Sequence, residues 1–190
     1  MGETKTNHVL VTGLPGSGKS TLCAVFKGRG INAVDADSHS PLLRWGKGEK
    51  LLERGAPIKW ILRNPPMWDV EKMKELLAKN NEIYVFGIAP NILRVIPSFD
   101  RVIYLHGDGA LIQNRLRSRT NNNFGTTNAQ RRFVSAIGGF ANLLIRTAAT
   151  VNSSFSIFDA SRPPEQLFFE IYSRFGGGVA QAQVVSLPKA

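Results

Sequence analysis

The chain has 190 residues and a formal net charge of +10, a length that buries a sizeable core without a structural metal and a charge that suits an anionic ligand or a nucleic acid. Cys23 is the only cysteine, so a disulfide framework is excluded and we expect a reducing, cytoplasmic setting. The polar N-terminus and the lack of eighteen consecutive apolar residues predict neither a signal peptide nor a membrane span.

A loop for a nucleoside triphosphate is predicted directly after the first apolar run, residues 8–11. Residues 13–21 read GLPGSGKST and match the pattern G-x-x-x-x-G-K-[ST]. Successive backbone N–H groups of such a loop turn toward an oxyanion at a helix N-terminus. Lys19 adds a mobile cation and Ser20 a hydroxyl for magnesium; the alternative is a glycine-rich turn without a ligand. The residues expected to contact the nucleotide are Gly13, Pro15, Gly16, Ser17, Gly18, Lys19, Ser20 and Thr21.

Two carboxylates follow the second predicted strand, residues 32–35. Asp35 and Asp37 have i, i+2 spacing at the carboxyl edge of the sheet, where ligands of open α/β sheets bind. One carboxylate near Ser20 can hold magnesium through water, while the other can accept a proton from an attacking hydroxyl. We assign Asp35 to magnesium and Asp37 to the acceptor hydroxyl. The alternative is a turn or helix cap.

Residues 40–79 combine tryptophans, cations and helix-breaking glycines. We expect short helices on a mobile insert, and a further helix that starts at Pro65 and Pro66. The tryptophans are expected in the core or in the wall of an acceptor pocket, although among cations they also suit stacking on nucleic-acid bases. They are Trp45, Trp60 and Trp68.

Three further strands are predicted over residues 82–86, 101–105 and 155–158, with helical patterns between the strands. Strands that alternate with helices imply parallel strands joined by right-handed crossovers. The predicted fold class is therefore α/β: three layers, α/β/α, with a five-stranded parallel sheet, the phosphate loop after the first strand, and a mobile lid.

The segment between Asp108 and Asp159 contains no acidic residue. Its cations are all arginines, whose planar forks suit phosphate oxygens and whose flat faces stack on rings. This pattern indicates a segment that faces an anion, and the alternative is a solvated basic face. The arginines are Arg115, Arg117, Arg119, Arg131, Arg132 and Arg146.

Two of these arginines, Arg115 and Arg119, are four residues apart, so on a helix they would share one face and meet one ligand. The residues that follow are rich in Asn, Gly and Thr and cannot continue a helix; Arg131 and Arg132 come where helical residues resume. We expect a flexible lid over about residues 120–132 that closes on a nucleotide, excludes water and delivers arginines to the transferring phosphoryl group.

Taken together, these motifs resemble the small P-loop kinases of the adenylate kinase, shikimate kinase and gluconate kinase type, over residues 8–175. The resemblance implies that Arg115 lies on the adenine, that Arg119 reaches phosphate and that Arg131 or Arg132 contacts the transferring group. It places Arg162, in the loop after the fifth strand, beside the adenine. The implied catalytic residues are Lys19, Asp37, Arg119, Arg131 and Arg132; the implied metal ligands are Ser20 and Asp35.

The implied activity is transfer of the γ-phosphoryl group of Mg-ATP to a hydroxyl or phosphate of a small acceptor, such as a nucleoside, nucleotide or sugar-acid-like compound. Residues 86–91 read FGIAPN. They lack the D-G-x-P-R sequence by which adenylate kinases hold AMP and the triple glycine of shikimate kinases. Neither AMP nor shikimate is therefore supported as the acceptor.

One domain is expected over residues 1–175, with an acceptor-binding insert at about 38–80, the lid at about 120–132 and a flexible tail over 176–190. The expected partners are ATP, Mg²⁺ and a small anionic or hydroxylated acceptor, and the chain is expected to be a monomer or weak dimer without membrane contact. The basic charge and the tryptophans leave an alternative, a nucleic-acid-end kinase or a nucleic-acid-binding P-loop ATPase. A non-catalytic interaction protein gated by nucleotide is the third hypothesis.

Overall fold

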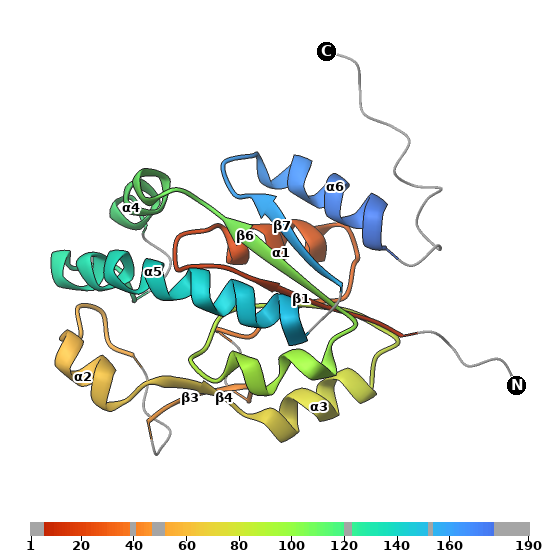
Figure 1. Ribbon diagram of the computed structural model, residues 1–190, viewed down its shortest axis with the longest axis horizontal. Helices are drawn as coiled ribbons and strands as arrows, with labels where there is room; N and C mark the ends of the chain where they lie inside the picture. Colours follow the sequence, from red (N-terminus) through yellow and green to blue (C-terminus); the bar gives the residue numbers. More distant parts are fainter. Residues whose placement is uncertain (1–5, 39–40, 47–51, 120–122, 152–153, 177–190) are drawn as a thin grey trace, which may run out of the picture.

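A central sheet of five parallel strands confirms the predicted α/β class (Figure 1). The computed structural model describes residues 6–38, 41–46, 52–119, 123–151 and 154–176, apart from the side chains of residues 141, 142, 146 and 151. The predicted tail after Gly176, the start of the predicted lid and parts of the insert lie outside these ranges. The strand order is β2 (Ala33–Asp35), β5 (Glu82–Phe86), β1 (Asn7–Thr12), β6 (Arg101–His106) and β7 (Phe155–Asp159).

Helices cover both faces of the sheet, as predicted (Figure 1). One face packs against α1 (Lys19–Gly28) and α6 (Pro164–Phe175), which contact each other. The other face packs against α3 (Val70–Ala78), the short 3₁₀ turns η1 (Ile92–Arg94) and η2 (Ile96–Ser98), and α5 (Asn128–Val151).

Apolar residues on both faces of the strands explain why these strands are continuous apolar runs in the sequence. Val9 and Val11 of β1 belong to the cluster under α1 and α6, whereas Leu10 between them belongs to the cluster under α3 and α5. All three side chains are fully buried. A parallel sheet with both faces covered requires this pattern, and it holds the carboxyl ends of the strands in fixed positions.

The insert contains a small second sheet that the sequence did not predict. Strand β3 (Leu43–Trp45) pairs antiparallel with β4 (Pro66–Trp68), and α2 (Ile58–Arg63) lies between them in the chain. The prediction that a helix starts at Pro65 and Pro66 is wrong, because Pro66 pairs with Trp45 at the end of this ribbon. A proline is tolerated at the first position of a strand.

Helix α3 begins four residues later than predicted, at Val70. Its N-cap is Asp69, whose carboxylate accepts a hydrogen bond from the Lys72 N–H at 3.2 Å. An aspartate N-cap satisfies one of the backbone donors that a helix start leaves free. The cap, and not the proline pair, therefore sets the start of this helix.

A buried asparagine fixes the ribbon to the main sheet. The side-chain amide of Asn91 donates to the Trp68 carbonyl at 2.8 Å and its oxygen accepts from the Trp68 N–H at 3.0 Å. Asn91 lies in the loop after β5, and Trp68 is 2% exposed. This pair of bonds places β4 beside the carboxyl ends of the main strands.

Helix α4 (Gly109–Arg117) ends before the second arginine of the predicted pair. Ser118 is its C-cap, so the prediction that Arg115 and Arg119 share one helix face is wrong. Ser118 donates from its hydroxyl to the Asn114 and Arg115 carbonyls, a local bond that competes with helix continuation. Arg119 is therefore aimed by the segment after the helix.

Helices α2 and α5 contact each other at one end of the molecule (Figure 1). Within the described ranges, no single helix is long and apolar enough to cross a membrane. Only the two parts of α5, Asn128–Phe140 and Leu143–Thr150, pass that test together by length and composition, and they meet at an angle of 44°.

Candidate active site

A cavity of about 960 Å³ opens at the carboxyl edge of the sheet. Its walls come from the phosphate loop, the ends of β2 and β5, the β3–β4 ribbon, α2, α5 and the loop before α6. This volume lies in the range of pockets that bury a sizeable ligand. The cavity therefore joins segments that are far apart in the sequence.

The phosphate loop connects β1 to α1 in the strand–loop–helix order that the sequence predicts. Gly18 is the N-cap of α1 and has φ of 95°, in the left-handed region that favours glycine. Seven of the eight predicted nucleotide contacts in this loop line the cavity; Gly13 lies at its start and does not. The lining residues are Pro15, Gly16, Ser17, Gly18, Ser20 and Thr21, together with Lys19.

Lys19 is buried within the loop at 6% exposure. Its Nζ donates to the Gly13 carbonyl at 2.7 Å and to the Leu14 carbonyl at 3.2 Å. Ser17 is 1% exposed, and its hydroxyl has no hydrogen-bond partner among the described residues. A buried hydroxyl without a partner is costly, so both side chains have bonding capacity that suits a phosphate.

The two predicted carboxylates lie together at the end of β2. The Asp35 Oδ1 accepts from the Asp37 N–H at 3.1 Å. Both carboxylate oxygens of Asp37 accept from the Ile88 N–H, at 2.9 and 3.2 Å. Asp37 lines the cavity and Asp35 does not, so these bonds orient Asp37 toward the space beside the phosphate loop.

The charged side chains around Asp37 influence one another's pKa values. Burial raises the pKa of Asp37 to about 6, against the opposing effects of Lys19 and the Ile88 N–H. Burial also lowers the pKa of Lys19 and of Arg119, while Asp35 and Asp37 act in the opposite direction on both. Two cations and two carboxylates therefore form one electrostatic centre, although Arg119 is about a hundred residues from the phosphate loop in sequence.

Arg115 and Arg162, both predicted to lie beside the adenine, line the cavity. The Arg115 guanidinium donates to the Ser17 carbonyl at 3.3 Å and so lies on the phosphate loop itself. Arg162 forms an ion pair with Glu170 of α6. Ala160, Pro164 and Leu167 add an apolar surface next to Arg162.

The structure places the two predicted lid arginines away from the cavity. Arg131 donates to the Gly125 carbonyl at 3.2 Å and to the Thr126 carbonyl at 2.9 Å, and also to the Asn128 side chain. Arg132 is exposed and does not line the cavity. Their contact with a transferring phosphoryl group remains a prediction, because Arg131 here binds the carbonyls of its own loop.

Gln130 is a structural residue of the lid that the sequence reading missed. It is 0% exposed, and its oxygen accepts from the Gly125 N–H at 2.8 Å and the Thr126 N–H at 2.9 Å. Its amide donates to the Ala56 carbonyl in the insert at 2.7 Å. The described part of the lid is thus bonded to the insert, and no local pattern in the sequence indicates this link.

Gly87 is a second residue that the sequence reading missed. A methyl group at Gly87 would lie 2.6 Å from Asp37 Oδ1 and 2.7 Å from Trp68 Cζ2. Only glycine lets the backbone after β5 approach these two side chains so closely. The FG pair at the end of the β5 apolar run is the signal that marks it.

The acid-free arginine segment does not act as one face. Arg115 and Arg119 line the cavity, Arg131 binds its loop, and Arg117 and Arg132 are exposed. The side chain of Arg146 lies outside the described part of the chain. Among the described side chains of this segment, Arg115 and Arg119 are therefore the two whose positions fit the predicted anion-facing role.

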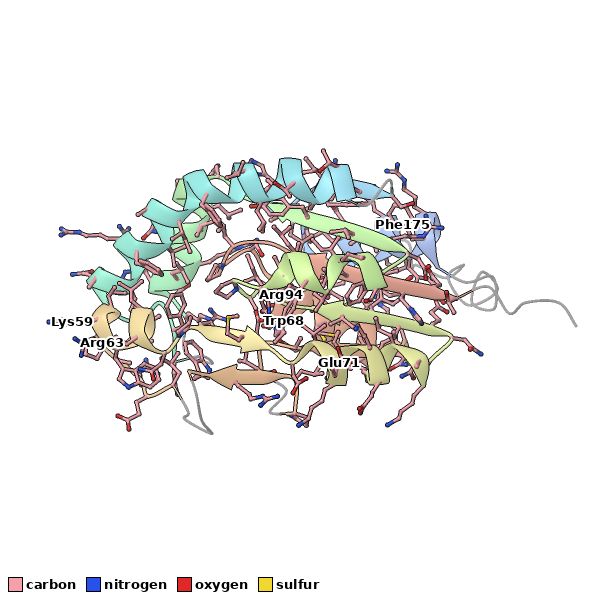
Figure 2. The ribbon with its side chains drawn as sticks, turned by 60° about the horizontal axis from the view of Figure 1, so that its bottom comes forward. Lys59, Arg63, Trp68, Glu71, Arg94 and Phe175 are labelled. Carbon is pink, nitrogen blue, oxygen red and sulfur yellow. The ribbon has the colours of Figure 1, made fainter. Side chains whose placement is uncertain are left out.

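The tryptophans do not form an exposed stacking platform. Trp68 is buried in the core. Trp45 and Trp60 are half-buried and lie with ring centroids 6.1 Å apart, and Trp45 lines the cavity. Exposed cations remain on α2, where Figure 2 shows Lys59 and Arg63 at one end of the molecule.

The oxygen donors beside the phosphate loop fit magnesium in part. Mg²⁺ is commonly held by one or two carboxylates with substrate phosphates and waters. Ser20 and Asp37 share the cavity wall, and Asp35 bonds to Asp37. The described residues contain no group of three His, Cys, Asp or Glu that would hold a metal alone. This set therefore suits a metal that arrives with a nucleotide.

Comparison with known proteins establishes the fold. No protein-family model and no curated protein matches the chain. A solved sugar kinase from Janibacter sp. HTCC2649 is similar at 22% identity and a TM-score of 0.50, over 88% of this chain and 93% of that one. Shikimate kinase from Acinetobacter baumannii, in complex with shikimate, is similar at 17% identity and a TM-score of 0.54, over 90% and 96%.

A gluconokinase from Sinorhizobium meliloti 1021 also matches, at 17% identity and a TM-score of 0.49, over 88% of this chain and 90% of that one. The first two structures are similar over nearly the full length of both chains. The chain has the fold of the small P-loop kinases, as the motifs predicted. At these identities the likeness concerns the fold, and the function has to be argued from the site.

Proposed function

We propose that this chain transfers the γ-phosphoryl group of Mg-ATP to a hydroxyl group of a small molecule. The observation that carries the proposal is the position of Asp37 and Arg119 in the wall of the cavity that also contains the phosphate loop. A phosphotransferase needs a donor site and an acceptor site that share one space closed to water. The fold, shared with a sugar kinase and a shikimate kinase, supports this class of reaction.

In the proposed reaction, the acceptor oxygen forms a bond to the γ-phosphorus while the bond from that phosphorus to the β–γ bridging oxygen breaks. The hydroxyl proton passes to the carboxylate of Asp37, and ADP leaves. Asp37 is held for this role by the Ile88 N–H. Because burial raises the pKa of Asp37 to about 6, this carboxylate accepts a proton more readily than an ordinary aspartate does.

Lys19 and Arg119 balance the negative charge of the transferring group. Lys19 leaves the Gly13 and Leu14 carbonyls, to which it donates in this structure, and turns toward the β and γ phosphates. Arg119 supplies a second cation to the transferring group. In this structure the charges of Asp35 and Asp37 already act on its guanidinium. Cations fixed in a cavity with little water stabilise the transition state without reorganisation.

Magnesium supplies neutralisation of the phosphate oxygens and orientation of the triphosphate. Ser20 and Asp35 would hold it, Ser20 through its hydroxyl and Asp35 through water. The nucleotide base would lie between Arg115 and the surface around Arg162, Ala160 and Leu167, all of which line the cavity. Arginine planes stack well on aromatic rings.

Acceptor-dependent transfer of label from γ-labelled ATP tests the proposal. The panel contains nucleosides, nucleotides, sugar acids, uncharged alcohols and oligonucleotides, each with magnesium and with EDTA. We expect a labelled product with at least one small acceptor, and no product with EDTA. ATP that is bound but never transferred to any small acceptor would contradict the assignment.

An oligonucleotide substrate is the second candidate, favoured by the charge of +10 and by exposed cations such as Lys59, Arg63, Arg117 and Arg132. Binding through phosphates weakens steeply as salt rises. A steep salt dependence with an oligonucleotide as the best acceptor would favour this candidate over the small-molecule kinase.

A further inference from the structure

We propose that the acceptor half of the cavity takes a hydroxyl compound whose body is uncharged and apolar. This inference rests on the proposed phosphotransferase function and narrows its substrate class. The observation behind it is a cavity wall that is apolar on two facing elements, with the charged groups confined to the phosphate loop, the reaction centre and the nucleotide end.

One apolar wall is a stripe along α5. Four of its side chains line the cavity at intervals of four, three and four residues, which is the spacing of one helix face. At one end the same face reaches the core, where Leu144 belongs to the cluster under α3 and α5. The stripe consists of Phe133, Ile137, Phe140 and Leu144.

The facing wall comes from the insert. Leu43 and Trp45 of β3 and Ile61 and Leu62 of α2 line the same cavity. Trp45 is supported from behind by Trp60, with ring centroids 6.1 Å apart. A flat, supported indole suits stacking on a ring of the acceptor.

Two of these wall residues are exposed far more than such side chains usually are. Phe140 is 62% exposed and Leu62 is 61% exposed, and they belong to the two helices that contact each other at the cavity. Clustered exposed apolar surface marks a binding site more often than scattered single residues do. An apolar ligand between α2 and α5 would remove this surface from water.

Among the described residues, no cation belongs to these two walls. Among the described lining residues, the cations are Lys19, Arg115, Arg119 and Arg162, which belong to the loop, the reaction centre and the nucleotide end. Arg44 of the ribbon is exposed and paired with Asp69. Lys59 and Arg63 of α2 are exposed and do not line the cavity.

Among the described lining residues of this half of the cavity, Asp37 is the carboxylate offered to the acceptor, and Asn123 is a further polar side chain. One hydroxyl can donate to Asp37, and that hydroxyl is the one that receives the phosphoryl group. Further hydroxyls or a carboxylate against Phe140, Ile137 or Leu62 would find no hydrogen-bond partner on these side chains, whereas an apolar body would cover their exposed surface. The site therefore selects for one hydroxyl on an apolar body and against polyols and sugar acids.

Calorimetric binding to the full chain, with a non-hydrolysable ATP analogue and magnesium present, tests this selection. The probe is 2-naphthylmethanol, and shikimate and gluconate serve as polar comparisons. We expect the naphthyl alcohol to bind at least about tenfold more tightly than either acid, because it buries apolar area between the two walls.

A matched pair of variants on α5 separates binding in the cavity from nonspecific binding to exposed apolar side chains. Phe140→Asp should weaken binding of the naphthyl alcohol at least about tenfold. Leu143→Asp, at a residue that is 58% exposed but does not line the cavity, should change it less than about twofold. Leu62→Asp, on the opposite wall, provides a second test of naphthyl alcohol binding if Phe140→Asp does not fold.

Binding of shikimate or gluconate as tight as that of the naphthyl alcohol would overturn the inference, as would equal losses in Phe140→Asp and Leu143→Asp. Label transfer from γ-labelled ATP is read separately. Selective binding without any transfer would contradict the phosphotransferase proposal and leave the apolar site in place. Transfer to gluconate but not to the naphthyl alcohol would contradict the apolar acceptor site and leave the phosphotransferase proposal in place.

Discussion

The two halves of the cavity are built in opposite ways. The nucleotide half is made mainly of contiguous sequence, the phosphate loop between β1 and α1, and its polar groups are backbone N–H groups and cations. The acceptor half is assembled from the ribbon, α2 and α5, whose residues are up to about a hundred positions apart, and its surface is apolar. In the proposed function, the nucleotide would therefore be bound by local structure and the acceptor by tertiary structure.

This contrast has a physical basis. A triphosphate is recognised by charge and by backbone dipoles, which a short loop at a helix start already provides. An uncharged acceptor has to be recognised by shape and by the removal of apolar surface from water, which needs several elements around it. Asp37 and Arg119 lie between the two halves, so changes there should affect the reaction more than the binding of either substrate.

Removal of Lys19 should have the largest effect and define the nucleotide half. Lys19→Ala is expected to lower phosphoryl transfer by at least about a hundredfold, because this cation neutralises charge that grows toward the transition state. Steady-state rates measure it, and circular dichroism checks the fold. Lys27→Ala, at an exposed lysine of the same helix, is the control and should retain parental turnover.

A rate for Lys19→Ala within about threefold of the parent would mean that the phosphate loop does not carry the chemistry. The assignment of the phosphate loop to the nucleotide, on which the contrast between the two halves depends, would then be wrong.

Asp37 should set the pH dependence of the reaction. Asp37→Asn is expected to lower turnover on the order of a hundredfold while ATP still binds. If the proposed function holds, kcat/KM of the parent chain should rise with pH through the Asp37 pKa of about 6, since the carboxylate has to be deprotonated to accept the proton. Asp35→Asn should keep this acid limb and raise the magnesium requirement.

The same group links pH to stability. The pKa of Asp37 is higher in the folded chain than its ordinary value of 3.8, so the folded state binds this proton more tightly than the unfolded state. Its stabilising contribution is complete below about pH 3.8 and is lost as pH rises through about 6. Denaturant titrations of the parent and of Asp37→Asn should therefore diverge over this window; parallel curves would contradict the burial argument.

Gly87 tests whether Asp37 is positioned by the backbone behind it. Gly87→Ala should push on Asp37 Oδ1 and Trp68 Cζ2, at 2.6 and 2.7 Å from the added methyl group, and lower turnover on the order of tenfold. A loss of about 1–3 kcal/mol in the free energy of unfolding should accompany it. Gly28→Ala, where nothing lies within 4 Å of a methyl group, should lose neither activity nor stability.

The sequence predicts the nucleotide half because each step there is local. An apolar strand, a glycine loop and a helix follow one another within residues 7–28, and the alternation of strands and helices determines the parallel sheet. The sequence predicts an acceptor-binding insert, but the tertiary contacts that shape its walls could not be predicted. Asn91 holds Trp68 across 23 positions and Gln130 holds Ala56 across 74, and neither amide belongs to a recognisable pattern.

Two predictions made from local patterns are wrong. The proline pair at the start of β4 resembles a helix start, but its partner strand β3 lies about twenty residues earlier, so only tertiary pairing reveals the ribbon. The four-residue spacing of Arg115 and Arg119 resembles one helix face, but α4 ends at Arg117 and the Ser118 hydroxyl bonds to carbonyls of its last turn.

The smallest effect is expected where the lid meets the acceptor half. Gln130→Leu would remove the bonds to the Gly125 and Thr126 N–H groups and to the Ala56 carbonyl. Removing these bonds should raise the acceptor KM severalfold and speed hydrogen exchange at residues 123–127 and around Ala56 together. The lid and the insert would then open as one unit.

Hydrogen exchange in the parent chain tests whether the lid and the insert respond together to a nucleotide. If a nucleotide closes the lid, a non-hydrolysable ATP analogue with magnesium should slow exchange over residues 123–132, and the Gln130 link should transmit the change to Ala56. Gln113→Ala is the control, because it cuts bonds from α4 to Arg131 and Ser135 but leaves the insert link intact. Slower exchange over residues 123–132 with no change at Ala56 would mean that the nucleotide half closes alone. The apolar walls would then be set before ATP binds, and the acceptor could enter first.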